Sequence, residues 1–408
     1  MKSWNPVDRP QIPIAQSPLS IHCTKANGLL KLPVKSNYQM YVCGITPYDA
    51  THLGHAATYL TFDLVHRYWL AQGAQVNYIQ NITDIDDPLL ERAKRDGVDW
   101  QELAHSQIDL FRSDMQNLRV LPPKHYEGAV AAIPEVIQSI SQLAQKDCVY
   151  DIDTDKYFEV HKDASFGSES HLTEHEMLKI FAERGGDPNR SGKKNPLDAL
   201  LWLSQREGEP AWQSQFGAGR PGWHIECAAI ALKYAQAESD YILDIQGGGQ
   251  DLIFPHHEMS ASQVRILTGT EFAKAYVHAA LIGLDGEKMS KSKGNLVFVS
   301  KLVAQGVNPM AIRWALLKRH YRQEYMWLRN ETDFAQQELN GLTQKLSGSQ
   351  IPPTSDLISK IYAFLANDLD SASAILAINE WVASEGSGGD AKLLKNVLDG
   401  LLGITLTA

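Results

Sequence analysis

The sequence predicts an α/β protein with a parallel sheet, an insertion and a C-terminal helical region. Tyr38–Val42 is a short β-prone run, and the apolar residues from His52 to Leu70 then recur at helical spacing. Val76–Ile82 is a second such run, with a helical pattern from Leu89. Alternating strands and helices favour a parallel sheet with ligands at the strands' carboxyl ends. Beyond Pro309 the pattern is helical.

Composition limits the protein class before any motif is considered. The chain has 408 residues, 44% of them hydrophobic and 21% charged, which predicts two or three globular units. It has no apolar run of about 18 to 20 residues and no hydrophobic signal core near Met1, so we expect a cytoplasmic protein without a membrane partner. The net charge of −10 argues against a general nucleic-acid binder.

The segments outside the first strand–helix units are predicted in chain order. Residues before 35 form an arm with one edge strand at Ile21–Thr24, and residues 100–148 are helical. Val149–Val160 alternates as a hairpin does, and residues 161–196 are rich in loops. We interpret this region as an insertion between two halves of the sheet.

The second half of the sheet begins with a helix after Gly222. The strand Tyr241–Ile245, a turn at Gly247–Gly249, a helix from about His256 and a strand at Ala275–Leu284 follow. The predicted divisions are 1–130 (arm and first half of the parallel-sheet domain), 131–220 (insertion), 221–300 (second half), 301–346 (helical stem) and 354–408 (short helical domain), with a linker at Ser347–Pro353.

Two short motifs point to nucleotide phosphates. His52 and His55 stand where a helix starts, so backbone N–H groups and the helix dipole would face an anion there, and Gly54 would allow close approach. Lys288 and Lys291 follow an Asp-Gly turn and could neutralise β- and γ-phosphates. Alone, the first motif is also typical of a surface or core pair and the second of a solvated loop. Together they resemble the signature pair of class I aminoacyl-tRNA synthetases.

The cysteines are candidates for metal binding. Only Cys23, Cys43, Cys148 and Cys227 are present, too few for a disulfide framework. Cys43 ends a strand, and of the adjacent His256 and His257 only one should face the ligand edge, because neighbouring helical side chains diverge by about 100°. Cys43, Cys227 and His256 would suit one Zn²⁺ with an open fourth position, although such cysteines can equally be buried packing.

The motifs in combination resemble cysteinyl-tRNA synthetases over roughly residues 38–320. The resemblance is carried by the segments Cys43–Asp49, His52–His55, Asn81–Asp87, Asn195–Asp198, Gly222–Cys227, Gly247–His257 and Lys288–Ser292. It implies a class I synthetase-type Rossmann (HUP) catalytic domain that activates cysteine as cysteinyl-adenylate. ATP with Mg²⁺ and one zinc that holds the substrate thiol would be required. A thiolate binds zinc better than a hydroxyl does, so the metal would distinguish cysteine from serine.

The resemblance also assigns site residues. It implies catalytic roles for His52, His55, Lys288 and Lys291. The implied adenylate pocket comprises Cys43, Gly44, Ile45, Thr46, Thr58, Asn81, Ile82, Thr83, Trp223, Gly249, Gln250, Asp251 and Ile282. Trp223 could wall the thiol pocket or belong to the core. Asp84, Asp86 and Asp87 could orient substrate groups or cap the next helix, and we expect at least one of them to be a cap.

Three departures from the synthetase pattern predict a different acceptor. Ser260 stands where the synthetases have a glutamate zinc ligand. Residues 331–408 carry 4 basic against 10 acidic residues, which suits RNA phosphates poorly. The run Glu183, Arg184, Gly185, Gly186, Asp187, Pro188 resembles the marker of the cysteine ligases of mycothiol biosynthesis, a shortened family of relatives, whereas by itself it is only a Gly-Gly turn beside charged residues.

We therefore expect an ATP-dependent (AMP-forming) ligase that joins L-cysteine to the amine of glucosaminyl-inositol. Its partners would be these small molecules without tRNA, and a monomer is favoured. One alternative is a cysteinyl-tRNA synthetase with a reduced anticodon-binding region. Another is an inactive paralogue that binds zinc or nucleotide as a regulator. The sequence does not identify the acceptor-binding residues or the role of Glu183–Pro188.

Overall fold

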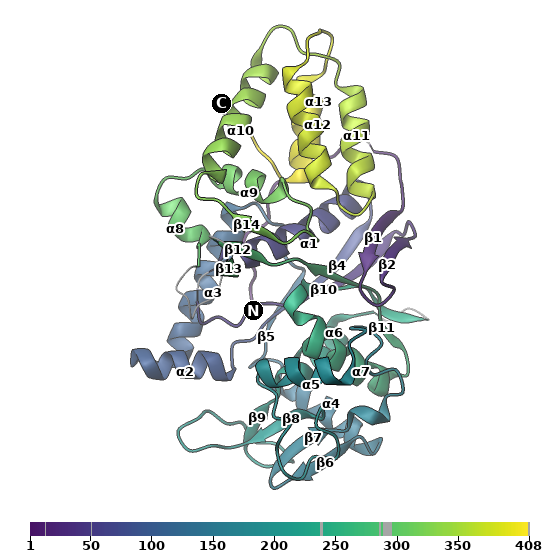
Figure 1. Cartoon of the computed structure of the whole chain (residues 1–408), viewed down its shortest axis with the longest axis vertical. Coiled ribbons are helices and arrows are strands. Elements are labelled where there is room, and N and C mark those ends of the chain that lie inside the picture. The colour runs from purple at the N-terminus through teal and green to yellow at the C-terminus, as the bar shows by residue number, and fades with distance from the viewer. Residues whose placement is uncertain (13, 50, 237–239, 285–286, 289–295, 407–408) are drawn as a thin grey trace.

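The central feature of the molecule is a parallel sheet with different structures on its two sides. The computed structural model describes residues 1–12, 14–49, 51–236, 240–284, 287–288 and 296–406. In Figure 1 the C-terminal helices lie above the central sheet and a small antiparallel sheet lies below it. Among the described residues, no helix combines the length and the apolar character that a membrane crossing requires.

The central sheet has five parallel strands in the order β11-β10-β3-β4-β5. The strands are β3 (Asn37–Val42), β4 (Gln75–Ile82), β5 (His125–Gly128), β10 (Tyr241–Gly249) and β11 (Glu271–Ala279). β3 is buried over nearly its whole length, as expected for a central strand covered on both faces. Successive connections leave β3 and β10 in opposite directions, so a topological switch point lies between them. Ligands of such sheets bind at the carboxyl ends of these strands.

Helices cover both faces of the sheet. One face packs against α1 (Leu53–Ala71), whose residues are mostly buried because C-terminal helices cover its outer side. The opposite face carries α4 (Ile133–Gln145), α6 (Trp223–Tyr234) and α7 (Glu258–Thr268), which contact one another. Between β5 and its preceding strand the chain forms α2 (Asp87–Asp96) and α3 (Trp100–Asn117).

The insertion contains a four-stranded antiparallel sheet. Its strands are β6 (Val149–Ile152), β7 (Asp155–Phe158), β8 (Ala199–Ser204) and β9 (Gly219–Pro221). β6 and β7 confirm the predicted hairpin, whose turn places Asp153 at a φ of 55°. The prediction that residues 161–196 are rich in loops is confirmed for most of the segment, although α5 (Glu174–Glu183) also lies there, started by a capping box between Thr173 and Glu176.

The C-terminal part is helical with one small sheet beside it. The helices are α8 (Val299–Ala304), α9 (Pro309–Leu317), α10 (Glu331–Ser347), α11 (Ser355–Ala366), α12 (Ser371–Ala383) and α13 (Ala391–Val397), followed by η5 (Leu398–Leu402). The small sheet joins β12 (Ile282–Leu284), β13 (Glu287–Lys288) and β14 (Tyr325–Trp327). β14 corrects the expectation that all residues after Pro309 are helical. It pairs with β12, which lies about 40 positions earlier, so local sequence gives little sign of it.

A fully buried ion cluster joins α1 to the C-terminal region. The Asp63 carboxylate accepts a hydrogen bond of 2.7 Å from Arg67 Nε and another from Arg313, and all three side chains are inaccessible to solvent. Arg313 also donates to the carbonyls of Leu402 (2.6 Å) and Leu118 (2.7 Å). The guanidinium groups hold the pKa of Asp63 below its ordinary value despite burial, which raises it.

Several predicted elements are confirmed and others need correction. The first strand–helix units agree with β3, α1, β4 and α2, and the N-terminal edge strand is half of the hairpin β1 (Leu19–Cys23) and β2 (Gly28–Leu32). The helical expectation for residues 100–148 missed β5, and Ala275–Leu284 is two strands, β11 and β12. The predicted turn at Gly247–Gly249 is the end of β10. The division of the chain into five segments stays a proposal.

Candidate active site and metal centre

A large cavity opens at the carboxyl edge of the sheet, where β3 and β10 end. Its volume is about 1110 Å³, and residues of the sheet edge, α1, α2, α6 and the insertion line it. The predicted site residues on its wall are Cys43, Gly44, Ile45, Thr46, His52, His55, Thr58, Trp223, Gly249, Asp251, Ile282 and Glu183 to Asp187. The topological switch point therefore coincides with the cavity that gathers most predicted site residues.

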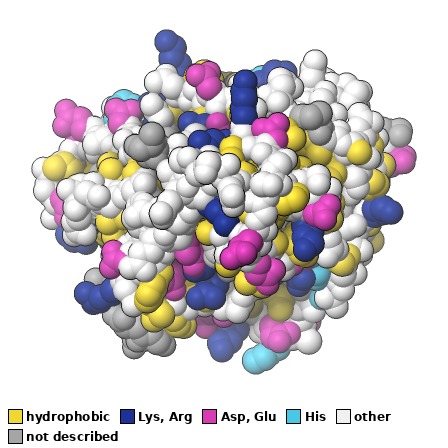
Figure 2. Space-filling view, turned by 90° about the horizontal axis from the view of Figure 1, so that it is seen from above, with side chains coloured by type: hydrophobic (Ala, Val, Ile, Leu, Met, Phe, Trp, Pro, Cys, Tyr) yellow, Lys and Arg dark blue, Asp and Glu magenta, His cyan; other side chains and the backbone are white. Residues whose placement is uncertain are grey.

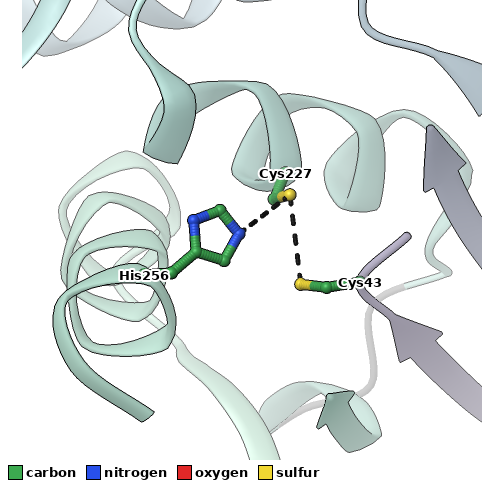
Figure 3. Close-up of side chains that lie close together, drawn as sticks. All are labelled: Cys43, Cys227 and His256. Carbon is green, nitrogen blue, oxygen red and sulfur yellow. Dashed lines mark hydrogen bonds between the residues drawn. The ribbon is translucent and has the colours of Figure 1, made fainter. Parts of the chain in front are cut away.

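Three buried side chains, one of them the cavity-lining Cys43, converge beside this edge of the sheet (Figure 3). Cys43 follows β3, Cys227 lies on α6, and His256 belongs to the helical turn η3 (Ile253–His257) before α7. The two sulfur atoms are 4.0 Å apart, and His256 Nε2 is 3.1 Å from Cys227 Sγ. All three ligand atoms lie within 4.8 Å of one another, and no other such group occurs in the described parts of the chain.

The arrangement fits a tetrahedral metal with one position left for a ligand. Two thiolates bound to one zinc at about 2.3 Å would lie roughly 3.8 Å apart, close to the separation of Cys43 and Cys227. Burial raises the pKa of Cys43 and would also raise that of Cys227, but the Cys43 hydrogen bond and nearby His256 bring the Cys227 pKa well below its usual range. Ser260, which stands where the synthetases have a glutamate zinc ligand, donates its hydroxyl hydrogen to the His256 carbonyl oxygen at 2.9 Å.

Two further histidines support the three ligands from outside. His257 Nε2 lies 3.2 Å from Cys43 Sγ, and its Nδ1 is 2.7 Å from His278 Nε2. His224 Nδ1 lies 3.1 Å from His256 Nδ1, which leaves His256 Nε2 facing the sulfur atoms. We expected only one residue of the His256–His257 pair to face the ligand edge, and that was wrong because both contact a cysteine. No role was predicted for His224 from the sequence. Its three-residue spacing from Cys227 places both side chains on one face of a helix, and this was the signal that could have identified it.

Trp223 combines the two roles that the sequence left open. Its ring stacks on His256 with 4.4 Å between centroids, and it also lines the cavity. The indole therefore covers one side of the metal centre while it packs against a ligand.

The predicted pocket residues of β4 lie one layer behind the cavity wall. The Asn81 carboxamide oxygen accepts hydrogen bonds from Gly44 N at 2.8 Å and Tyr41 Oη at 3.0 Å, and Asn81 Nδ2 donates to Thr83. A Cβ on Gly44 would lie 1.7 Å from the Asn81 carbonyl oxygen, so only glycine fits there. Ile82 and Thr83 are buried. These residues support the loop after β3, while their contact with substrate stays a prediction.

The helix start at His52 differs in one respect from the prediction. His52 Nδ1 accepts from Gly54 N at 3.1 Å and His55 N at 3.4 Å, so the His52 side chain caps the helix and these two N–H groups are not available to an anion. Gly54 is required because its Cβ would lie 2.9 Å from the His52 ring. Burial lowers the pKa of His55 to about 4, which keeps its ring neutral near pH 7.

The remaining predicted residues have different surroundings. Lys291 lies outside the described residues, and Lys288 is described only by its backbone in β13. Gln250 lies outside the cavity wall and donates to Glu324. Asp86 caps α2 by accepting from Asp87 N at 2.8 Å, which confirms the expectation of at least one cap.

The run Glu183–Pro188 folds against the metal-ligand segment. Arg184 donates to the backbone carbonyls of Asp251 and Phe254, and Phe254 is two residues before His256. Gly185 has a φ of 84°, and a Cβ on Gly186 would lie 2.5 Å from the Phe181 ring. Glycine is thus favoured at position 185 by the backbone conformation, and at position 186 by the lack of space for a side chain.

Comparisons with known proteins agree with this architecture. Residues 31–338 match the family of tRNA synthetases class I (C) catalytic domain. The chain is 51% identical to a Kribbella flavida protein named L-cysteine:1D-myo-inositol 2-amino-2-deoxy-alpha-D-glucopyranoside ligase, and 50% identical to a Streptomyces coelicolor protein of the same name, with 100% of each chain covered. A Mycobacterium tuberculosis methionyl-tRNA synthetase bound to methionyl-adenylate shares the fold, with a TM-score of 0.63, 15% identity and coverage of 86% of this chain and 82% of that one.

Proposed function

Because the chain belongs to the L-cysteine:1D-myo-inositol 2-amino-2-deoxy-alpha-D-glucopyranoside ligases of the class I (C) synthetase family, we propose that it joins L-cysteine to the amine of glucosaminyl-inositol. ATP supplies the energy, and AMP and diphosphate are released. The observation that carries this proposal is the convergence of Cys43, Cys227 and His256 beside the cavity that His52 and His55 line.

In the first half-reaction, a cysteine carboxylate oxygen attacks the α-phosphorus of ATP and diphosphate leaves. His52 uses Nδ1 as a helix cap, so its neutral ring carries a proton on Nε2 that can be donated to a phosphate oxygen. His55 contributes a second neutral imidazole in the cavity wall. We assign Lys288 and Lys291 to the charge that develops on the leaving diphosphate, with Mg²⁺ accompanying ATP.

Cys43, Cys227 and His256 would hold one zinc ion. When bound, zinc would supply a Lewis-acidic position that takes a thiolate and discriminates against the serine hydroxyl. His224 and His257 orient the ligand side chains, and Trp223 shields one side of them from water.

In the second half-reaction, the amine nitrogen of glucosaminyl-inositol attacks the carbonyl carbon of cysteinyl-adenylate. A C–N bond forms, the C–O bond to the phosphate breaks, AMP departs with the bonding electron pair, and the nitrogen loses one proton to water. No protein nucleophile is needed, so the chain's contribution is to place the amine against the carbonyl.

The charge of the C-terminal region is unsuited to binding tRNA, which favours a small-molecule acceptor. Residues 331–408 carry 4 basic and 10 acidic side chains, and phosphate binding requires the opposite balance. On the face shown in Figure 2, lysines and arginines are scattered among acidic residues and form no continuous basic patch. Independence from tRNA, a cytoplasmic location and a monomeric state remain proposals.

The test is acceptor choice. Purified protein is incubated with ATP and cysteine, together with glucosaminyl-inositol or tRNA, and the products are separated by mass. We expect cysteinyl-glucosaminyl-inositol and uncharged tRNA. Charging of tRNA without the sugar product would favour the synthetase alternative, and absence of cysteine-dependent ATP–diphosphate exchange would favour the inactive paralogue.

Replacement of Cys227 tests the metal assignment. We expect Cys227→Ser to lower zinc content and to raise the cysteine KM in diphosphate exchange at least about tenfold, since one thiolate ligand is lost. Zinc is measured by elemental analysis. Cys148→Ser is the matched control, because Cys148 is a buried free cysteine outside this group. Full zinc content with normal exchange in Cys227→Ser would remove Cys227 from the site.

A further inference from the structure

The cavity has a second wall that the adenylate residues do not account for. The insertion contributes it, chiefly through Tyr157, Phe181, Leu200 and the segment 183–187. This wall and the sheet edge line the same cavity. An acceptor must enter between the two walls, because the sheet edge holds the predicted adenylate residues.

The segment 183–187 is fixed close to the position of the reacting carbonyl. Arg184 donates to the carbonyls of Asp251 and Phe254, and helix α5 packs against η3, which carries the ligand His256. In a cysteine bound through sulfur, only two carbon atoms separate the sulfur from the carbonyl carbon. The amine that attacks this carbon therefore comes close to η3 and to the segment packed on it.

Most charged groups of this wall are already paired. Arg184 is bound to backbone carbonyls, and Arg190 donates to Asp155 and Tyr157. Arg220 pairs with Asp87 and Glu209, and Asp187 accepts from Lys193 at 2.7 Å and from Tyr157. Within the described residues, Glu183 is the charged side chain of this wall without a hydrogen bond or ion pair.

The position of Glu183 is unfavourable for helix stability. It is the last residue of α5, where the negative end of the helix dipole repels a carboxylate, and it is exposed at the cavity wall. An unpaired carboxylate there favours a ligand that brings hydrogen-bond donors and positive charge, and it disfavours phosphate. An aminated polyol has these properties.

We infer that the insertion wall is the acceptor site and that the Glu183 carboxylate accepts hydrogen bonds from the hydroxyl or ammonium groups of an aminated polyol. This inference rests on the proposed function and names the site of its second substrate. Arg184 is a positioning residue that holds the segment against η3.

The two half-reactions allow a direct test with Glu183→Gln and Glu183→Ala in the full chain. We expect the KM for glucosaminyl-inositol to rise about 10- to 100-fold, the range for loss of a charge-assisted hydrogen bond. Cysteine-dependent ATP–diphosphate exchange should stay within about twofold of the unmodified protein. The melting temperature should not fall in Glu183→Gln, because the neutral side chain relieves the dipole repulsion.

Glu174→Gln is the matched control, since Glu174 is an exposed carboxylate at the other end of the same helix. It should leave acceptor KM and exchange unchanged. An unchanged acceptor KM in Glu183→Ala with intact exchange would overturn the acceptor assignment alone. Equal losses in both half-reactions would assign Glu183 to the adenylate and also overturn it. If the unmodified protein shows no exchange, the proposed function fails, and this assignment fails with it.

Discussion

At the scale of single residues, a chain of side chains reaches the candidate metal site from the surface hairpin. Thr24 Oγ1 lies 2.7 Å from His278 Nδ1, and His278 contacts His257, which contacts Cys43. A hydroxyl that donates to His278 Nδ1 leaves the proton on Nε2, and the same reasoning places a proton on His257 Nε2. The chain then ends with an N–H donor directed at the Cys43 sulfur, the arrangement that stabilises a thiolate ligand.

His257→Phe should lower zinc affinity by about 10- to 100-fold, because an aromatic ring still fills the space but the N–H donor to Cys43 is lost. Competition with a chromophoric chelator measures this affinity without reference to turnover. His257→Gln keeps an N–H donor and should recover part of the loss. His66→Phe is the control, since His66 is buried beside Tyr78, outside the cavity and the metal cluster. Equal zinc affinity in His257→Phe and the unmodified protein would contradict the role.

The sequence could predict the three residues of the candidate metal site but not this second layer. Cys43, Cys227 and His256 were identified through a family resemblance, because their wide spacing is not diagnostic by itself. His257 was discarded on helical geometry, yet the two neighbouring rings meet different cysteines: His256 lies beside Cys227 and His257 beside Cys43. His278 lies in the interior strand β11, where the sequence pattern does not show which side chain it meets.

At the scale of elements, Gly247 in the glycine run of β10 is explained by packing between this strand and helix α1. A Cβ on Gly247 would lie 2.2 Å from the ring of Phe62, a fully buried residue of α1. Gly247→Ala should therefore destabilise the protein by about 1–3 kcal/mol, measured by urea unfolding. Gly341→Ala is the contrast, because its Cβ would meet only Val382 at 3.8 Å and helix propensity should stabilise it by up to about 1 kcal/mol. Equal effects would refute the packing explanation.

Helix α3 contains a buried carboxylate that should make stability depend on pH. Burial raises the pKa of Asp114 to about 7, whereas an unfolded aspartate titrates near 3.9. The folded state disfavours the ionised form, so stability should fall as pH rises from about 4 to 7, by a total on the order of 2–4 kcal/mol. Asp114→Asn should remove this dependence in urea unfolding at several pH values, whereas Asp109→Asn on the exposed face of α3 should retain it. A slope unchanged by Asp114→Asn would contradict the assignment.

The elements that sequence reasoning missed are short or are specified by distant partners. β5 has four residues without an alternating pattern and is a strand because it pairs with β4. The glycines at the end of β10 suggest a turn locally, but they continue the strand, and Gly247 is needed there because the Phe62 ring of α1 leaves no room for a Cβ. The periodic segments around β3, α1 and β4 were predictable since their buried faces follow strand and helix periods.

At the scale of the whole molecule, the buried Asp63–Arg67–Arg313 cluster connects the catalytic sheet with the C-terminal helices. Arg313→Met removes one cation and leaves Asp63 less compensated, so we expect a loss of about 3–5 kcal/mol in the free energy of unfolding. Arg95→Met, at an exposed pair with Asp96, should change it by less than about 1 kcal/mol. Because the pKa of Asp63 is depressed in the folded state, its stabilisation holds above about pH 4 and is lost as acid protonates it. Similar losses in both variants would argue against the cluster as an anchor.

The separation of the metal ligands along the chain has a consequence for biogenesis. Cys43 and His256 are 213 positions apart and reach each other only after β3 and β10 have paired. We therefore expect the ion to bind after the sheet has formed, so that it completes the site without initiating folding. Metal supply would then govern how many finished molecules become competent for cysteine, while chelation would silence them without dismantling their architecture.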